Sequence, residues 1–311
     1  MNQVPDRTPA SFWYHHSGRE DAGTLVEQQM QWYREADLDY IKIMYDLEYA
    51  LEERVETAAD WNKIKPLGKR APQYQKQLEI IKRVLEQTNG ECMVLDTTFG
   101  PMRHVVWLAE NSNEKMLAHI RENPEAVKNG VTAIAECMAE WMDGFLEAGA
   151  DGVFYAAQFG EPGRFTEEEW EMLIKESDLV VLNEIRRHSG KYLLLHPCGQ
   201  PAYQHRVELS RYVEYPKDMV NWAVHANELS LEEGRKLFQC PVMGGMDNRG
   251  AIAQEDFEAT EKEIRRILAE TNPEGFILGT DCSLPGKPSV DIIKHAMEVV
   301  KVCGRTKQNR I

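Results

Sequence analysis

Three residues of this chain have the side chains and the spacing to bind one metal ion: His196, Cys198 and Cys282. The first two lie in the run Leu-Leu-Leu-His-Pro-Cys-Gly, and Cys282 lies in Ile-Leu-Gly-Thr-Asp-Cys-Ser. Residues i and i+2 of a strand point the same way, so His196 and Cys198 can face one ion. One imidazole and two thiolates leave zinc an open coordination position, which is typical of a catalytic site. A His-x-Cys pair alone is more often incidental, but a third soft ligand after another apolar run favours a zinc site.

The elements that must position these ligands follow a regular pattern. Short apolar runs alternate with helical patterns across almost the whole chain, which is typical of βα units around a parallel sheet. Eight runs are predicted as strands, near residues 10–16, 39–45, 92–97, 151–156, 191–196, 219–224, 240–245 and 275–279. Eight such units predict a single (β/α)8 TIM barrel over residues 1–311, in which the carboxyl ends of the strands converge on one mouth.

The connections between the strands carry helix signals. Asn123-Pro124 predicts the start of a long helix that continues through Leu146, and Thr166-Glu-Glu-Glu resembles a capping box that opens a helix to His188. The segment 47–91 is less regular. It is interpreted as an excursion near the barrel mouth, with a helix over residues 72–87.

Composition excludes several classes of partner. Among the 311 residues, 51 acidic side chains against 36 basic ones give a net charge of −15, which repels nucleic acid and anionic membranes. No apolar run approaches the roughly 18 residues needed to span a bilayer. The amino-terminal residues do not resemble a signal peptide, so we expect a cytoplasmic protein. We also expect either a monomer or a homodimer. Six cysteines in such a chain do not suggest a disulfide framework.

Other residues near the predicted strand ends are candidates for binding substrate or moving protons. The predicted substrate contacts are Trp13, His15, Tyr155, Gln158, Trp222 and Asp247. Asp46 and His16 are the candidates for a proton shuttle, from their positions alone. For most of these residues a structural role explains the sequence about as well: core packing for the aromatic residues and histidines, helix capping for Asp46, and a turn for Asp247.

Several short motifs, taken together, resemble the uroporphyrinogen decarboxylase superfamily over nearly the whole chain. Residues 12–19, Phe-Trp-Tyr-His-His-Ser-Gly-Arg, are similar to that family's Trp-x-x-Arg-Gln-Ala-Gly-Arg, and residues 43–46 to its Phe-Ser-Asp. Residues 98–101 are similar to its Gly-Pro-Phe turn, residues 149–152 to the opening of its fourth strand, and residues 244–247 to its Gly-Asn-Val-Asp.

Departures from the decarboxylase motifs indicate a branch of the superfamily. The arginine with which decarboxylases grip porphyrin carboxylates is replaced by His15, and Thr280-Asp-Cys stands near their Gly-His-Gly. The pattern His-x-Cys…Cys instead resembles the zinc-dependent, corrinoid-linked methyltransferases. That resemblance implies zinc as cofactor, a corrinoid protein as partner, and a small methyl donor or acceptor as substrate.

Within this branch the sequence leaves several alternatives open. A methoxylated aromatic donor is slightly favoured over a thiol acceptor such as coenzyme M, because aromatic residues stand near the strand ends. His225, Glu161 and Asp281 are candidates for a fourth zinc ligand, with His225 slightly preferred because it follows the sixth strand. A decarboxylase, and a non-catalytic barrel that binds zinc or a tetrapyrrole, are the competing interpretations.

Overall fold

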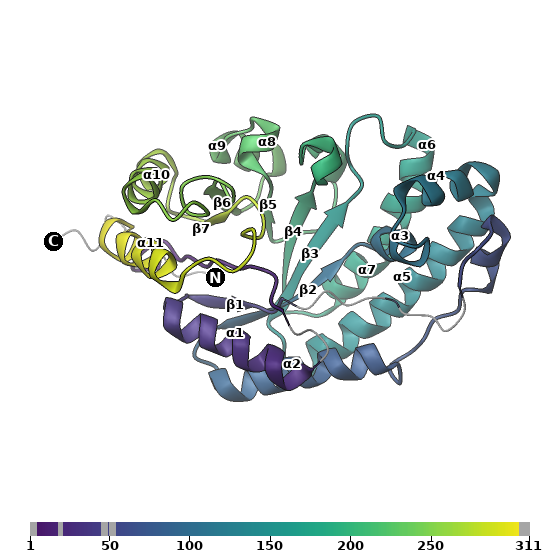
Figure 1. Ribbon diagram of the computed structural model, residues 1–311, viewed down its shortest axis with the longest axis horizontal. Helices are drawn as coiled ribbons and strands as arrows, with labels where there is room; N and C mark the ends of the chain where they lie inside the picture. The colour runs from purple at the N-terminus through teal and green to yellow at the C-terminus, as the bar shows by residue number, and fades with distance from the viewer. Residues whose placement is uncertain (1–4, 18–20, 45–48, 50–53, 305–311) are drawn as a thin grey trace.

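Seven parallel strands form one sheet in which each strand pairs with the next along the chain (Figure 1). The computed structural model describes residues 5–17, 21–44, 49 and 54–304. The strands are β1 (Tyr40–Lys42), β2 (Met93–Phe99), β3 (Gly152–Gln158), β4 (Tyr192–Cys198), β5 (Met219–Asn221), β6 (Val242–Met246) and β7 (Phe276–Thr280). Together with the helices that cover them, they form a single α/β domain with the architecture of a TIM-like barrel.

The long helices lie on the outer side of the sheet (Figure 1). The helices of the amino-terminal half are α1 (Ala22–Ala36), α2 (Pro72–Thr88), α3 (Pro101–Leu108), α4 (Asn113–Glu122) and α5 (Pro124–Glu147). Those of the carboxyl-terminal half are α6 (Glu167–Glu169), α7 (Glu176–Arg187), α8 (Val224–Asn227), α9 (Leu231–Phe238), α10 (Phe257–Glu270) and α11 (Val290–Cys303). No helix in the described part of the chain is long and apolar enough to cross a membrane.

Residues 10–16, predicted as the first of eight strands, are not a regular strand. Their extended backbone makes isolated parallel bridges to the β7 side, from Ala10 to Leu278 and from Tyr14 to Leu284. On the other side the carbonyl of Ala10 accepts a hydrogen bond from the Asp39 amide at 3.1 Å. The amide of Ala10, however, donates to the Asp39 side chain at 2.7 Å, so a carboxylate takes the place of a strand carbonyl. Seven of the predicted strands are thus confirmed, and regular pairing of an eighth is absent from the described residues.

Alternation along the strands decides which side chains enter the barrel. On β3 and β4 the register pairs Phe154 with Leu194, Ala156 with His196 and Gln158 with Cys198. Phe154 and Leu194 belong to the apolar cluster inside the barrel. Because side chains two residues apart share a face, Gln158, His196 and Cys198 lie on the same inner side, nearer the carboxyl ends.

The predicted helix starts are confirmed. Pro124 is the first residue of α5, and the side chain of Asn123 accepts a hydrogen bond from the amide of Ala126 at 3.1 Å. Thr166 and Glu169 form the predicted capping box, and the helix continues from α6 through a π-helical turn (Trp170–Lys175) into α7.

Part of the segment predicted as an excursion is described. It contains a 3₁₀ helix (Ala58–Lys63) whose Trp61 is buried, with its Nε1 donating to His119 Nδ1 at 3.1 Å. This helix packs along α5, and the predicted helix over residues 72–87 is confirmed as α2. Residues 45–48 and 50–53 lie outside the described part of the chain.

Candidate metal centre

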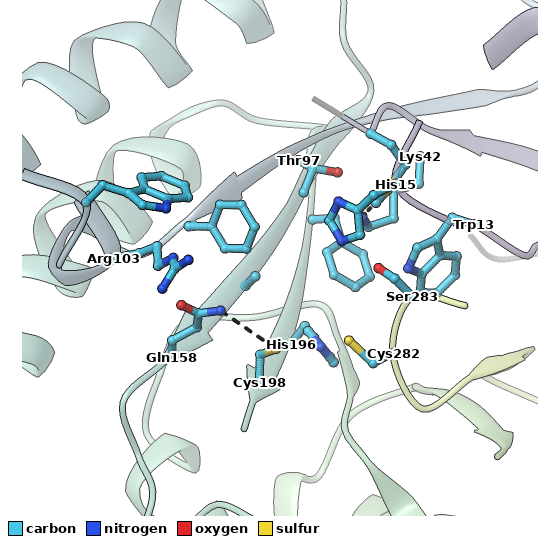
Figure 2. A pocket seen from close by; sticks show the side chains of 15 residues that line it. Trp13, His15, Lys42, Thr97, Arg103, Gln158, His196, Cys198, Cys282 and Ser283 are labelled. Carbon is cyan, nitrogen blue, oxygen red and sulfur yellow. Dashed lines mark hydrogen bonds between the residues drawn. The ribbon is translucent and has the colours of Figure 1, made fainter. Parts of the chain in front are cut away.

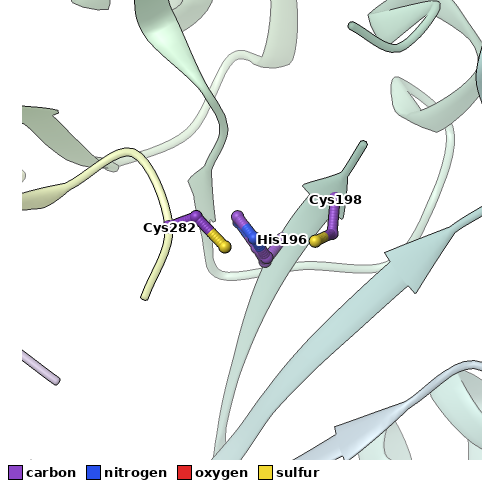
Figure 3. Close-up of side chains that lie close together, drawn as sticks. All are labelled: His196, Cys198 and Cys282. Atoms are coloured by element: carbon purple, nitrogen blue, oxygen red, sulfur yellow. The ribbon is translucent and has the colours of Figure 1, made fainter. Parts of the chain in front are cut away.

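His196, Cys198 and Cys282 come together at the carboxyl ends of the strands (Figure 3). His196 and Cys198 stand two residues apart on β4, and Cys282 follows the end of β7 by two residues. One ligand atom from each residue, an imidazole nitrogen or a sulfur, lies within 4.8 Å of the other two. The structure therefore brings together three candidate ligands, of which the first and the last are 86 residues apart in the chain.

The His196 imidazole is oriented for metal binding. Its Nδ1 lies 3.1 Å from the backbone carbonyl oxygen of Asn221, which can only accept, so Nδ1 carries the proton. The other ring nitrogen, Nε2, is buried and has no hydrogen-bond partner among the described residues. A buried lone pair without a donor costs stability unless a ligand completes it. Hydrogen bonding of one ring nitrogen to a carbonyl is also the usual outer contact of a zinc-bound histidine.

The two thiols are hydrogen-bonded to each other. The hydrogen bond from Cys198 holds the pKa of the Cys282 thiol well below its usual range, against the opposing effect of burial. The same hydrogen bond, together with burial, raises the pKa of Cys198 well above its usual range. Of the two, Cys282 therefore loses its proton more readily, and zinc binding would displace the protons that both thiols carry. One nitrogen and two sulfurs are a donor set that suits zinc.

A cavity of about 320 Å³ opens on one side of these three ligands (Figure 2). Its walls carry aromatic rings from Trp13, Phe99, Trp107 and Phe154. Gln158 also lines the cavity, with its Nε2 3.9 Å from the sulfur of Cys198. The cavity has the size and the flat apolar walls that suit a small aromatic or aliphatic molecule.

A second cavity of about 290 Å³ lies on another side of the same three ligands. Its lining includes the polar residues His205, His225, Asp247, Asn248, Arg249 and Asp281. Both cavities share His196, Cys198 and Cys282. A metal held there would be accessible from two directions.

With this geometry established, comparisons identify the family. The profile of the uroporphyrinogen decarboxylase (URO-D) family matches residues 42–302. The chain belongs to the uroporphyrinogen decarboxylase family. The match contains all three candidate ligands and begins after residues 12–19, so the amino-terminal resemblance lies outside it. A search among curated proteins finds no match.

Solved structures support the fold of this family member. A methyltransferase from Methanosarcina mazei superposes with a TM-score of 0.74 at 12% identity, covering 96% of this chain and 94% of that one. A B12-independent methionine synthase from Shewanella sp. W3-18-1 gives a TM-score of 0.56 at 12% identity, covering 97% and 96%. A putative B12-independent methionine synthase from Listeria monocytogenes gives 0.53 at 11% identity, covering 97% and 99%.

The structure places most of the predicted site residues of this URO-D family chain around the two cavities. Trp13, His15 and Gln158 line the first, and His225 and Asp247 line the second. His16 is buried beside Tyr14, with ring centroids 4.5 Å apart, and does not line either cavity. Asp46 lies outside the described residues.

Two predicted substrate contacts, Tyr155 and Trp222, are instead in the core. Tyr155 points away from the barrel interior because its neighbours Phe154 and Ala156 point inward, and its hydroxyl donates to Asp178 on α7 at 2.6 Å. Trp222 is fully buried, and its Nε1 donates to the carbonyl of Leu229 at 3.2 Å. Neither side chain lines a cavity beside the three ligands.

The candidates for a fourth ligand have other contacts. His225 lies outside the group of ligand atoms, with its Nδ1 2.9 Å from Asp281 Oδ2, and this hydrogen bond raises the pKa of His225. Glu161 accepts hydrogen bonds from Arg164 at 3.1 Å and from the amide of Gln200 at 3.1 Å. Within the described residues, the group therefore has three protein ligands.

Sequence reasoning missed two cations that line the first cavity, Lys42 and Arg103. Lys42 is buried on β1, and its Nζ lies 4.4 Å from the ring centre of Phe154. Arg103 of α3 stacks over Trp107 at 4.7 Å. The position of Lys42 within an otherwise apolar strand could have indicated a functional role, since a buried lysine rarely serves packing alone.

Proposed function

We propose that this protein is a zinc-dependent methyltransferase that moves a methyl group between a small molecule and the cobalt of a corrinoid protein. The observation that carries the proposal is the group His196, Cys198 and Cys282, because all three residues line two cavities. In addition, the Nε2 atom of His196 is buried and has no partner among the described residues. The family assignment and the fold of the Methanosarcina mazei methyltransferase support it.

Different residues of the chain would bind the metal and the substrate. Two thiolates and a neutral imidazole would hold zinc with no net charge and one open position. Bound there, zinc would act as a Lewis acid that draws charge from a substrate oxygen or sulfur. Gln158 donates to the sulfur of Cys198 and so tempers its charge. The aromatic walls hold the substrate body, and Lys42 and Arg103 bring positive charge to the same cavity.

A methoxylated aromatic compound is the donor that we favour over a thiol acceptor such as coenzyme M. The rings of Trp13, Phe99, Trp107 and Phe154 suit a flat substrate. In the reaction, the methyl carbon–oxygen bond breaks and a cobalt–carbon bond forms. Co(I) supplies the electron pair and becomes Co(III), and the aryl oxide leaves and takes a proton. Asp46 or His16 as the source of that proton remains a proposal from the sequence.

Zinc content and methyl transfer test this function together. We expect about one zinc per purified chain, and with 2-methoxyphenol and cob(I)alamin as probes we expect methylcobalamin to form, as followed by its absorption spectrum. Cys282→Ser should lose both while its circular dichroism stays unchanged. Less than about 0.2 zinc per wild-type chain would overturn the proposal, since three N/S ligands hold zinc tightly.

Two further assays separate the alternatives. Transfer from methylcobalamin to 2-mercaptoethanesulfonate, with no reaction of 2-methoxyphenol, would assign the thiol direction instead. Turnover of uroporphyrinogen that a chelator leaves unchanged would indicate a decarboxylase. If Cys282→Ser lowers the melting temperature strongly and wild type transfers no methyl group, the zinc is structural.

A further inference from the structure

Asn221 connects the strands that carry the three candidate ligands. It is the last residue of β5, is fully buried, and lies next to β4 in the sheet. Its backbone carbonyl accepts the hydrogen bond from His196 Nδ1 at 3.1 Å. Its side-chain Nδ2 donates both to the carbonyl of Met243 on β6 at 3.1 Å and to the carbonyl of Thr280 on β7 at 3.2 Å.

The contact with Thr280 leads directly to Cys282. Thr280 is the last residue of β7, and its Oγ1 donates to the backbone carbonyl of Cys282 at 2.6 Å. A continuous series of hydrogen bonds therefore runs from the His196 imidazole through Asn221 and Thr280 to the backbone that carries the Cys282 sulfur. Since β5 and β7 are not neighbours in the sheet, the Asn221 side chain makes a link that strand pairing cannot make.

The neighbouring backbone leaves room for this amide. Gly244 on β6 has a φ of +123°, and a Cβ atom added there would lie 2.8 Å from Asn221 Nδ2. The amide oxygen, Oδ1, is buried without a partner among the described residues, which costs stability. The buried Asn221 amide thus leaves one oxygen without a partner in the described part of the chain and requires a glycine at position 244. Both features indicate that Asn221 has a role other than packing.

We propose that Asn221 is the positioning residue of the metal centre. It keeps the proton on His196 Nδ1, so that Nε2 offers its lone pair, and it sets the separation between the β4 ligands and Cys282. The first task falls to its backbone carbonyl. Asparagine suits the second because one amide nitrogen supplies two N–H donors for the two carbonyls on β6 and β7. An aspartate at position 221 has the same shape, but it would place a carboxylate oxygen against those carbonyl oxygens, which would repel it. This inference rests on the proposed zinc-dependent function.

Asn221→Asp tests the proposal with Asn227→Asp as the matched control. Asn227 also donates from its amide to a carbonyl, that of Ala223 at 2.9 Å, but it does not contact the three ligands. Competition with a chelator should show zinc affinity falling by about 10- to 100-fold in Asn221→Asp, as for other outer contacts of zinc ligands, and unchanged in Asn227→Asp. The Co²⁺-substituted protein should show an altered absorption spectrum only in Asn221→Asp. If Asn221→Asp does not fold, Asn221→Ser, which retains one donor, takes its place.

A measurement on the metal-free protein separates positioning from stability. ¹⁵N chemical shifts of His196 should show the Nδ1-protonated tautomer in wild type and in Asn227→Asp. Asn221→Asp should show a mixture, because repulsion between the new carboxylate and the carbonyls of Met243 and Thr280 should displace the backbone carbonyl of residue 221 from His196. Wild-type zinc affinity together with an unchanged Co²⁺ spectrum in Asn221→Asp would overturn the inference, even if its melting temperature falls. Wild-type protein that binds no zinc would overturn both this inference and the proposed function.

Discussion

Two groups of three residues in the described part of the chain bring metal-binding side chains within 4.8 Å of one another, and only one has the properties of a metal site. The first is His196, Cys198 and Cys282 at the strand ends. The second is Asp143 on α5 with Glu184 and His188 at the end of α7, and we call it the outer triad. The distances between side chains do not distinguish them.

The two groups differ in whether their ligand atoms already have partners in the protein. In the outer triad Asp143 Oδ2 lies 2.8 Å from Lys69 Nζ, Asp143 Oδ1 lies 3.2 Å from His188 Nε2, and Glu184 accepts from Arg187 at 3.0 Å. Cations of the protein thus already occupy the positions that a metal would take. At the strand ends, by contrast, a buried nitrogen has no partner among the described residues. An unsatisfied buried atom, rather than proximity, therefore separates the candidate metal centre from the outer triad.

Burial alone is also insufficient, as a third group shows. Asp178 on α7 is 1% exposed, and both of its oxygens are satisfied, by Tyr155 at 2.6 Å and Tyr215 at 3.1 Å. It lies behind β3, on the side away from the cavities. We therefore assign it to the structure of the molecule, and its variants should change stability without changing methyl transfer.

The largest effect is expected from Cys198→Ser. Replacing the soft sulfur by a hydroxyl removes one of three ligands, so zinc should be lost and methyl transfer should fall at least about 100-fold. His188→Ala in the outer triad is the matched control and should retain zinc and activity. The contrast between the two groups would be wrong if Cys198→Ser kept its zinc, or if His188→Ala lost as much zinc and methyl transfer as Cys198→Ser.

Asp178 is expected to give an intermediate effect that appears in the pH dependence of stability. Burial raises its pKa to about 7, against an ordinary value of 3.8. Between these two values the unfolded chain has lost the proton that the folded protein keeps, so the free energy of unfolding decreases as pH rises through this range. At 1.36 kcal/mol per pKa unit, this contribution is on the order of a few kcal/mol and is lost above about pH 7.

Asp178→Asn removes the ionisable group and keeps the shape. Its free energy of unfolding, measured with urea between pH 4 and pH 8, should vary less with pH than that of wild type. Its zinc content and methyl transfer at a fixed pH should equal those of wild type. A loss of zinc in Asp178→Asn, with the fold retained, would show that this satisfied group also supports the metal centre.

The sequence allowed the grouping of the three candidate ligands to be predicted, because much of its geometry is local. His196 and Cys198 share a face because they are two residues apart on one strand, and Cys282 follows another apolar run. The same alternation, applied to Phe154 and Tyr155, would have placed Phe154 rather than Tyr155 in the cavity. Seven strands were predictable for the same reason, since each has a continuous buried pattern of its own.

Contacts between distant segments could not be predicted in this way. The irregular residues 10–16 depend on the Asp39 side chain, which takes the Ala10 amide that a regular ladder would pair with a carbonyl. Likewise, the role of Asn221 depends on carbonyls of two other strands, 22 and 59 residues away. Periodicity reports which face a residue occupies, but not which partner it meets there.

The smallest effect is expected in the outer triad itself, from Glu184→Gln combined with His188→Ala. Its ion pairs lie at the surface, where such pairs contribute about 0–1 kcal/mol, so the free energy of unfolding should change by less than about 1 kcal/mol. The zinc content per chain should stay at the wild-type value, because Lys69 remains paired with Asp143. Elemental analysis of the double variant, and of the same changes in Cys198→Ser, measures whether any zinc resides there. Zinc could persist in Cys198→Ser and disappear only when the outer triad is also changed. That result would mean that the outer triad binds zinc despite its ion pairs. Whether ligand atoms already have partners in the protein would then be the wrong criterion for a metal site.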